Sequence, residues 1–102
     1  KYRIINSFFL KKISLSKLQV KDEYIERIIQ FLKTNFSITS LDLSDNLLTD
    51  KGATQLQHFI EFDNQTLISL NLENNKINTE IIWLLIKIKL ENNLRKKRRY
   101  LY

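Results

Sequence analysis

The sequence predicts an α/β solenoid in which a short parallel sheet lies inside and helices lie outside. A pattern of apolar residues recurs along the 102-residue chain at intervals of 28 and then 29 residues. In each copy, apolar and polar residues first alternate, as in a strand with one buried face, and apolar residues then recur three and four apart, as in a helix. The chain is 43% hydrophobic and has one glycine and no proline, which argues against a disordered chain.

The second and third copies of the pattern are the clearest. The second has apolar residues and an asparagine at Ile38, Leu41, Leu43, Asn46 and Leu48. The third has the same arrangement at Leu67, Leu70, Leu72, Asn75 and Ile77. Their alternation predicts strands over residues 39–44 and 68–73, and helices that run to about residue 62 and over 80–92. We expect Asp50 to cap the first of these helices and Asn78 or Thr79 to cap the second.

The first copy begins at Leu10 and departs from the pattern at one position. Its members are Leu10, Ile13, Leu15, Leu18 and Val20, with Leu18 in place of the asparagine. That asparagine normally bonds free backbone groups of neighbouring turns. Its loss is typical of a terminal repeat. Asp22 is the expected cap of the helix predicted over 23–34.

These copies divide the chain into one repeat domain and a short tail. The expected domain covers 1–94, with repeats at 10–37, 38–66 and 67–94. Residues 1–9 are the end of a preceding repeat or an N-terminal cap that covers the first edge of the sheet. Residues 95–102 form a basic C-terminal tail.

The motif Leu-Thr-Asp-Lys-Gly-Ala-Thr-Gln-Leu at 48–56 and the run from Asn64 to Ile77 resemble leucine-rich repeats of the ribonuclease-inhibitor-like subclass. Members of that subclass include ribonuclease inhibitors, receptors of innate immunity and activators of a nuclear-transport GTPase. The resemblance implies a segment of a right-handed horseshoe that binds a protein partner on its concave strands. The sequence has no nucleotide-binding loop, metal cluster or paired acid and base, so we expect neither catalysis nor a cofactor. A GTPase-activating role like that of some relatives is an alternative, although those proteins have far more repeats.

The strand residues that alternate with the leucines should face the concave side, because successive strand side chains point to opposite faces. They form four rows across the repeats: Lys12, Ser40 and Ser69; Ser14, Asp42 and Asn71; Ser16, Ser44 and Glu73; Lys17, Asp45 and Asn74. We take these twelve residues as the candidate partner-binding site. The alternative is an ordinary sheet face that only contacts solvent. The face has no aromatic residue, although binding hot spots are enriched in tryptophan and tyrosine, and this favours the alternative. Asp42, Asp45 and Glu73 match no known metal loop, so no metal is expected.

The net charge of +6 comes almost entirely from one run of residues. Of the 17 basic residues, five are consecutive: Arg95, Lys96, Lys97, Arg98 and Arg99. The remaining 12 basic residues nearly balance the 11 acidic ones. The basic run is the second candidate site, for nucleic acid, an anionic membrane or nuclear localisation. The alternative is that the basic run binds nothing and is a charged cap that keeps the last repeat soluble.

Several functional classes are excluded or disfavoured by what the chain lacks. There is no cysteine, so disulfides and thiolate chemistry are excluded. The single histidine, His58, should lie on the outer helical side, out of reach of the concave serines, so a Ser-His-Asp site is excluded. The longest apolar run, 81–86, is too short to span a bilayer. We expect a non-enzymatic, intracellular, cytoplasmic module, with the nucleus as alternative location and no small-molecule substrate. Trp83 fits either the core or an exposed edge.

Overall fold

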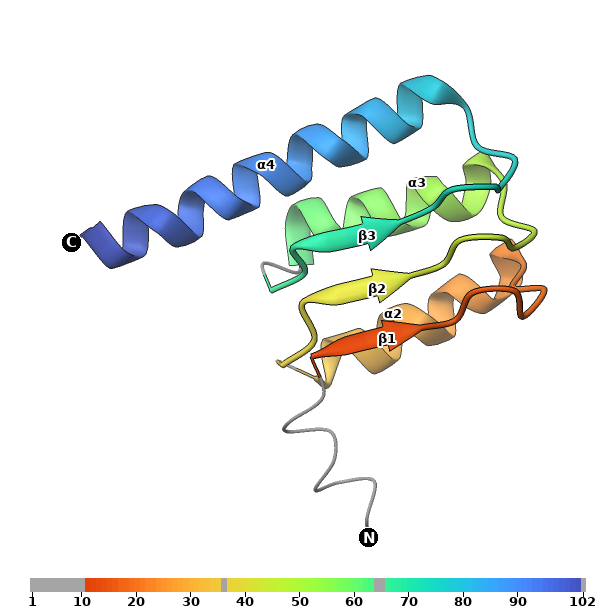
Figure 1. The fold of residues 1–102 in the computed structure, drawn as a ribbon, viewed down its shortest axis with the longest axis horizontal. Coiled ribbons are helices and arrows are strands. Elements are labelled where there is room, and N and C mark those ends of the chain that lie inside the picture. Colours follow the sequence, from red (N-terminus) through yellow and green to blue (C-terminus); the bar gives the residue numbers. More distant parts are fainter. Residues whose placement is uncertain (1–10, 36, 64–65, 102) are drawn as a thin grey trace, which may run out of the picture.

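The structure is a computed structural model, and it describes residues 11–35, 37–63 and 66–101. Three parallel strands form a sheet in the order β1-β2-β3, and helices cover one of its faces (Figure 1). The elements in chain order are β1 (Lys12–Ser14), η1 (Asp22–Tyr24), α2 (Ile25–Lys33), β2 (Ser40–Asp42), α3 (Asp50–His58), η2 (Phe59–Asp63), β3 (Ser69–Asn71) and α4 (Thr79–Leu101). The predicted solenoid of three strand–helix units is confirmed. The expected N-terminal cap, residues 1–9, and Leu10 lie outside the described residues.

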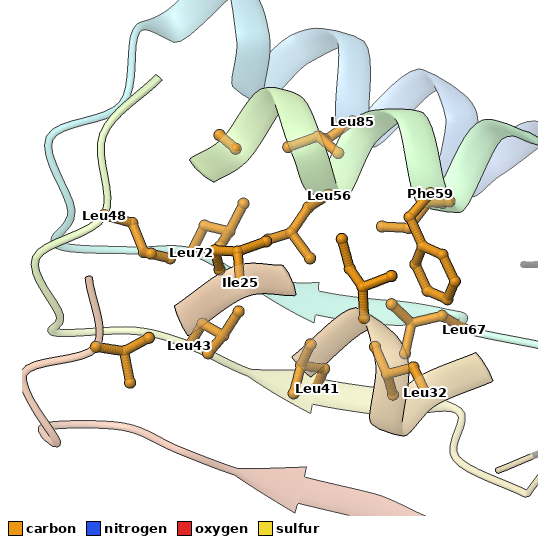
Figure 2. Close-up of a cluster of buried hydrophobic side chains, with 14 of the residues drawn as sticks. Ile25, Leu32, Leu41, Leu43, Leu48, Leu56, Phe59, Leu67, Leu72 and Leu85 are labelled. Atoms are coloured by element: carbon orange, nitrogen blue, oxygen red, sulfur yellow. The ribbon is translucent and has the colours of Figure 1, made fainter. Parts of the chain in front are cut away.

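The leucines of the repeat pattern form the core between the sheet and the helices. Leu41, Leu43 and Leu48 of the second repeat are at most 1% exposed. They belong to one cluster with Ile25 of α2 and Leu56 of α3, as Figure 2 shows. The alternation of strand residues therefore points every second side chain into one shared core.

The three helical units differ at their ends from what the sequence predicts. The second ends in a π-helical segment, η2, which buries Phe59 and Ile60. The third does not stop near residue 92 but continues to Leu101, so the backbone of the basic run is helical. The boundary expected at residue 94 therefore falls inside α4. The strands, with three residues each, are also shorter than predicted.

Two asparagines join the turns that follow the strands. Asn46 is 7% exposed, and its Oδ1 accepts the backbone N–H groups of Leu18 and Val20 at 3.1 and 2.9 Å. Its Nδ2 lies 3.0 Å from the carbonyl oxygens of Leu15 and Leu43. The expected role of this residue, satisfying backbone groups of neighbouring turns, is confirmed.

Asn75 repeats the arrangement one unit later. Its Oδ1 accepts the N–H of Leu48 at 3.0 Å, and its Nδ2 donates to the carbonyl oxygen of Leu43 at 2.9 Å. The first repeat has Leu18 at this position, with a side chain that is 61% exposed. Each asparagine thus bonds the repeat before its own.

The expected capping roles of Asp22 and Asp50 are wrong. Neither α2 nor α3 has a side-chain bond at its N-cap. Asp22 instead accepts from the backbone and hydroxyl of Thr49, and Asp50 accepts the N–H of Asn78 at 2.6 Å. Only Asn78 caps as predicted, because its Oδ1 accepts the N–H of Glu80 at 2.9 Å. The aspartates therefore connect successive repeats.

Candidate protein-interaction surface

The strand register brings the predicted concave residues together in rows. Lys12 pairs with Ser40 and Ser40 with Ser69, while Ser14 pairs with Asp42 and Asp42 with Asn71. Paired residues of neighbouring parallel strands lie side by side, because adjacent strands are only about 4.8 Å apart. The first two predicted rows are thus present as structural neighbours.

The row Ser14, Asp42 and Asn71 is held by bonds within each repeat. Asp42 Oδ1 accepts the N–H of Ser44 at 2.9 Å, and Asn71 Oδ1 accepts the N–H of Glu73 at 3.0 Å. Ser14 Oγ accepts the N–H of Ser16 at 3.5 Å in the same way. These bonds to the residue two positions on, which short polar side chains form readily, fix the orientation of the row.

Asp42 is the charged member of that row. The backbone N–H of Ser44, and next its hydroxyl, hold the pKa of the Asp42 carboxyl below its ordinary value. Burial opposes this effect, and the hydroxyl of Ser14, which donates to Oδ2 at 3.4 Å, adds to it. The strand face therefore presents an ionised carboxylate at neutral pH.

The row Ser16, Ser44 and Glu73 is only partly available to a partner. Ser44 is 7% exposed, and its Oγ lies 3.1 Å from the Oγ of Ser16. The expectation that Ser44 is exposed to solvent is therefore wrong, and its side chain is little available to a partner. Glu73 is exposed at the last strand.

The row Lys17, Asp45 and Asn74 lies at the turns. All three have left-handed backbones, with φ of 60°, 55° and 58°. Asn74 Nδ2 donates to Asp45 Oδ1 at 2.8 Å. Asp and Asn adopt this conformation more readily than most residues, so the turn geometry by itself explains part of the polar pattern.

Other residues singled out in the sequence lie away from the concave rows. His58 is exposed at the end of α3, with its ring 5.8 Å from that of Phe62. Trp83 on α4 is 65% exposed, which decides between its two predicted places. Among the residues that the structure describes, no three histidines or carboxylates gather as metal ligands. Within the same part of the chain, no helix has the length and apolarity needed to cross a membrane.

A groove between β3 and α4 was not predicted from the sequence. It has a volume of about 450 Å³ and is lined mostly by apolar side chains, among them Leu70 and Leu72 from the sheet and Ile82 and Ile86 from the helix. The available signal was the apolar run 81–86, which has more apolar residues than one packed helix face requires.

Comparisons with known proteins agree with this architecture. Residues 34–56 and 63–82 match a family model described as Leucine Rich repeat. A solved structure named "Leiomodin-1 Actin-Binding Site 2 (ABS2)" superposes with a TM-score of 0.72 at 20% identity, over 92% of this chain and 70% of that chain. No curated protein matches the sequence. Strand order, repeat spacing and these likenesses together show that the chain folds as an α/β leucine-rich repeat solenoid.

Proposed function

We propose that this solenoid is a non-catalytic module that binds a protein partner through its concave strand face. The observation that carries the proposal is the row Ser14, Asp42 and Asn71, whose side chains are oriented before any partner arrives. Preorganised polar groups lose less freedom on binding. An ionised Asp42 in the middle of the row suits a partner that presents lysine, arginine or backbone N–H groups.

The repeat spacing and the structural neighbour refine the proposal. Repeats of 28 and 29 residues with a helix in each support the ribonuclease-inhibitor-like subclass. The leiomodin-1 structure is named for an actin-binding site. Actin is therefore the first protein partner to test.

The test is co-sedimentation with purified actin filaments, using the intact chain and charge variants. Asp42→Lys with Glu73→Lys reverses two concave carboxylates, and Glu26→Lys with Glu61→Lys makes the same charge change on exposed helical positions. Loss of binding in the first pair alone supports the concave face. Equal loss in both pairs would show that net charge, not this face, governs binding. Circular dichroism checks that each variant is folded.

A second candidate function uses the basic run, which α4 carries as a helical segment. Five consecutive cationic residues suit phosphates of nucleic acid or of an anionic membrane, or a nuclear import receptor. The variant with glutamine at Arg95, Lys96, Lys97, Arg98 and Arg99 tests it. Binding to a DNA duplex or to anionic vesicles that falls steeply with salt and disappears in this variant favours the basic run over the concave face.

A further inference from the structure

The side of β3 that faces away from β2 is an open sheet edge. In the described part of the chain, no strand pairs with this side, because the sheet order ends at β3. Leu43 and Asp45 donate their N–H groups to the carbonyl oxygens of Asn71 and Glu73, both at 2.8 Å. Asp42 pairs with Asn71, so Leu72, the residue after β3, lies opposite Leu43. Equivalent residues of parallel strands direct their N–H groups the same way, so the N–H of Leu72 points away from β2, to the open side. Such an edge is a template for another strand.

The groove beside this edge offers apolar pockets along the same line. Its 450 Å³ lies between the strand residues Leu70 and Leu72 and the helix residues Ile82, Leu85 and Ile86. Beside the second repeat, Leu67 and Leu72 of the third repeat belong to the shared core, as Figure 2 shows. The groove could therefore accommodate one more strand whose alternate side chains are apolar.

The described part of this chain does not supply that strand. One more period of 28 or 29 residues after Leu67 leads to residue 95 or 96, which lies within α4. Figure 1 shows α4 running back past the start of β3 instead of turning into the sheet. Its residues Trp83, Ile86, Leu90 and Leu94, spaced three and four apart, are all exposed. Among the residues that the structure describes, none covers the edge, the groove and this stripe of α4 together.

Lysines of α4 beside the groove favour an acidic partner. Lys89 lines the groove, and Lys87 is exposed on the same helix. Beyond them α4 continues through the five basic residues 95–99. Glu73, two residues after β3, is the acidic residue that lines the groove. A segment with carboxylates at the end nearest Lys89 is therefore the complementary ligand.

We propose that the open edge of β3 and the groove beside α4 form a docking site for an extended acidic peptide segment of another protein. The segment adds to the sheet as a fourth strand. Its main chain bonds the outward groups of β3, its alternate apolar side chains enter the groove, and its carboxylates meet Lys89. Recognition by strand addition combines main-chain bonds with pockets for alternate side chains.

Two other occupants fit these features less well. A bilayer would leave the outward N–H and C=O groups of β3 without partners, because hydrocarbon offers none. A second copy of the chain would bring two runs of five cationic residues into one assembly, with mutual repulsion. An acidic strand satisfies the backbone edge and the charge at once.

The experiment is fluorescence anisotropy with the full chain and a fluorescein-labelled peptide of four glutamates followed by alternating valine and threonine. Two forms of the peptide carry N-methyl groups on one or the other alternate set of amides. Alternate N–H groups of a strand point to opposite edges, and only one edge of the bound peptide faces β3. Methylation of the amides on that edge should therefore abolish binding, and methylation of the other set should not. Ile86→Glu should weaken binding about tenfold. Leu84→Glu is the matched control, since Leu84 is 40% exposed and Ile86 41%, but only Ile86 lines the groove.

Each outcome decides the proposal. Binding that Ile86→Glu weakens about tenfold, that Leu84→Glu leaves unchanged and that only one methylated form loses establishes strand addition. No binding of the unmethylated peptide, or equal loss with both methylated forms, overturns it. A dimer in sedimentation velocity that Ile86→Glu dissociates would assign the site to a second copy. Flotation with phosphatidylserine vesicles that the same change abolishes would assign it to a membrane surface.

Discussion

The carboxylate of Asp22 in the first repeat holds Thr49 of the second. Its Oδ1 accepts the backbone N–H of Thr49 at 2.9 Å, and its Oδ2 accepts from the Thr49 hydroxyl. Asp50 repeats the contact one unit later with the N–H of Asn78. Since Thr49 and Asn78 precede α3 and α4, these bonds fix where each helix begins relative to the previous repeat.

Gly52 makes room for this contact. A Cβ at Gly52 would press against Asp22 Oδ1 and would lie 3.1 Å from its Cγ and 3.2 Å from Ile25 Cγ1. We expect Gly52→Ala to lower the free energy of unfolding by about 1–3 kcal/mol, through overpacking and displacement of Asp22. Urea denaturation monitored by circular dichroism measures this change.

The control for that prediction is the same substitution in an Asp22→Ala background. With the carboxylate gone, most of the loss should disappear, because alanine also gains up to about 1 kcal/mol over glycine within a helix. Strictly additive losses in the double variant would show that Asp22 is not the group that Gly52 accommodates.

Asn46→Ala should cost more stability than Asn75→Ala. Asn46 is buried and bonds Leu18, Val20 and Leu15, whereas Asn75 is half-buried at the last repeat. Leaving buried backbone groups without partners costs roughly 1–3 kcal/mol, so we expect Asn46→Ala near the upper end and Asn75→Ala near the lower. Chemical denaturation compares the two; the reverse order would contradict the role of burial here.

Leu43→Ala should destabilise the chain by about 2–5 kcal/mol, and Leu72→Ala by an amount near the lower limit. Leu43 is 0% exposed between two repeats, while Leu72 is 8% exposed and borders the groove beside α4. A cavity next to an existing groove loses fewer contacts than one in a closed core. Urea midpoints with unchanged slopes provide the comparison. A loss below about 0.5 kcal/mol for Leu43→Ala would contradict its place in the core.

Asp42 should give stability a dependence on acid pH. Its pKa in the folded chain is lowered, chiefly by the N–H of Ser44. A group with a depressed folded pKa contributes stability that is present above its unfolded pKa and is lost as pH falls through the folded one. We therefore expect the contribution of Asp42 to decline below about pH 4. NMR titration of its carboxyl carbon locates the pKa, and Asp42→Asn should flatten the stability profile in that range.

Repeat spacing alone predicted the parallel register, the buried leucines and the role of Asn46. These features follow from local rules: alternation sets which strand face is buried, and a fixed period places equivalent residues side by side. Ser14, Asp42 and Asn71 were aligned correctly for that reason. The chemistry of the aspartates was missed, because Asp22 has the position of a helix cap while its partner, Thr49, is 27 residues away.

The sequence by itself thus determined the repeat unit, its core and the alignment of the first two polar rows. Only the tertiary structure decided that Ser44 is buried. It also decided how the third repeat ends: α4 continues through the basic run, and β3 is left with an open edge beside a groove. The physical reason is that interior repeats meet neighbours of their own kind, so one pattern describes each contact. Beside the third repeat the described residues supply no such neighbour, and packing against α3 decides how much of α4 is buried.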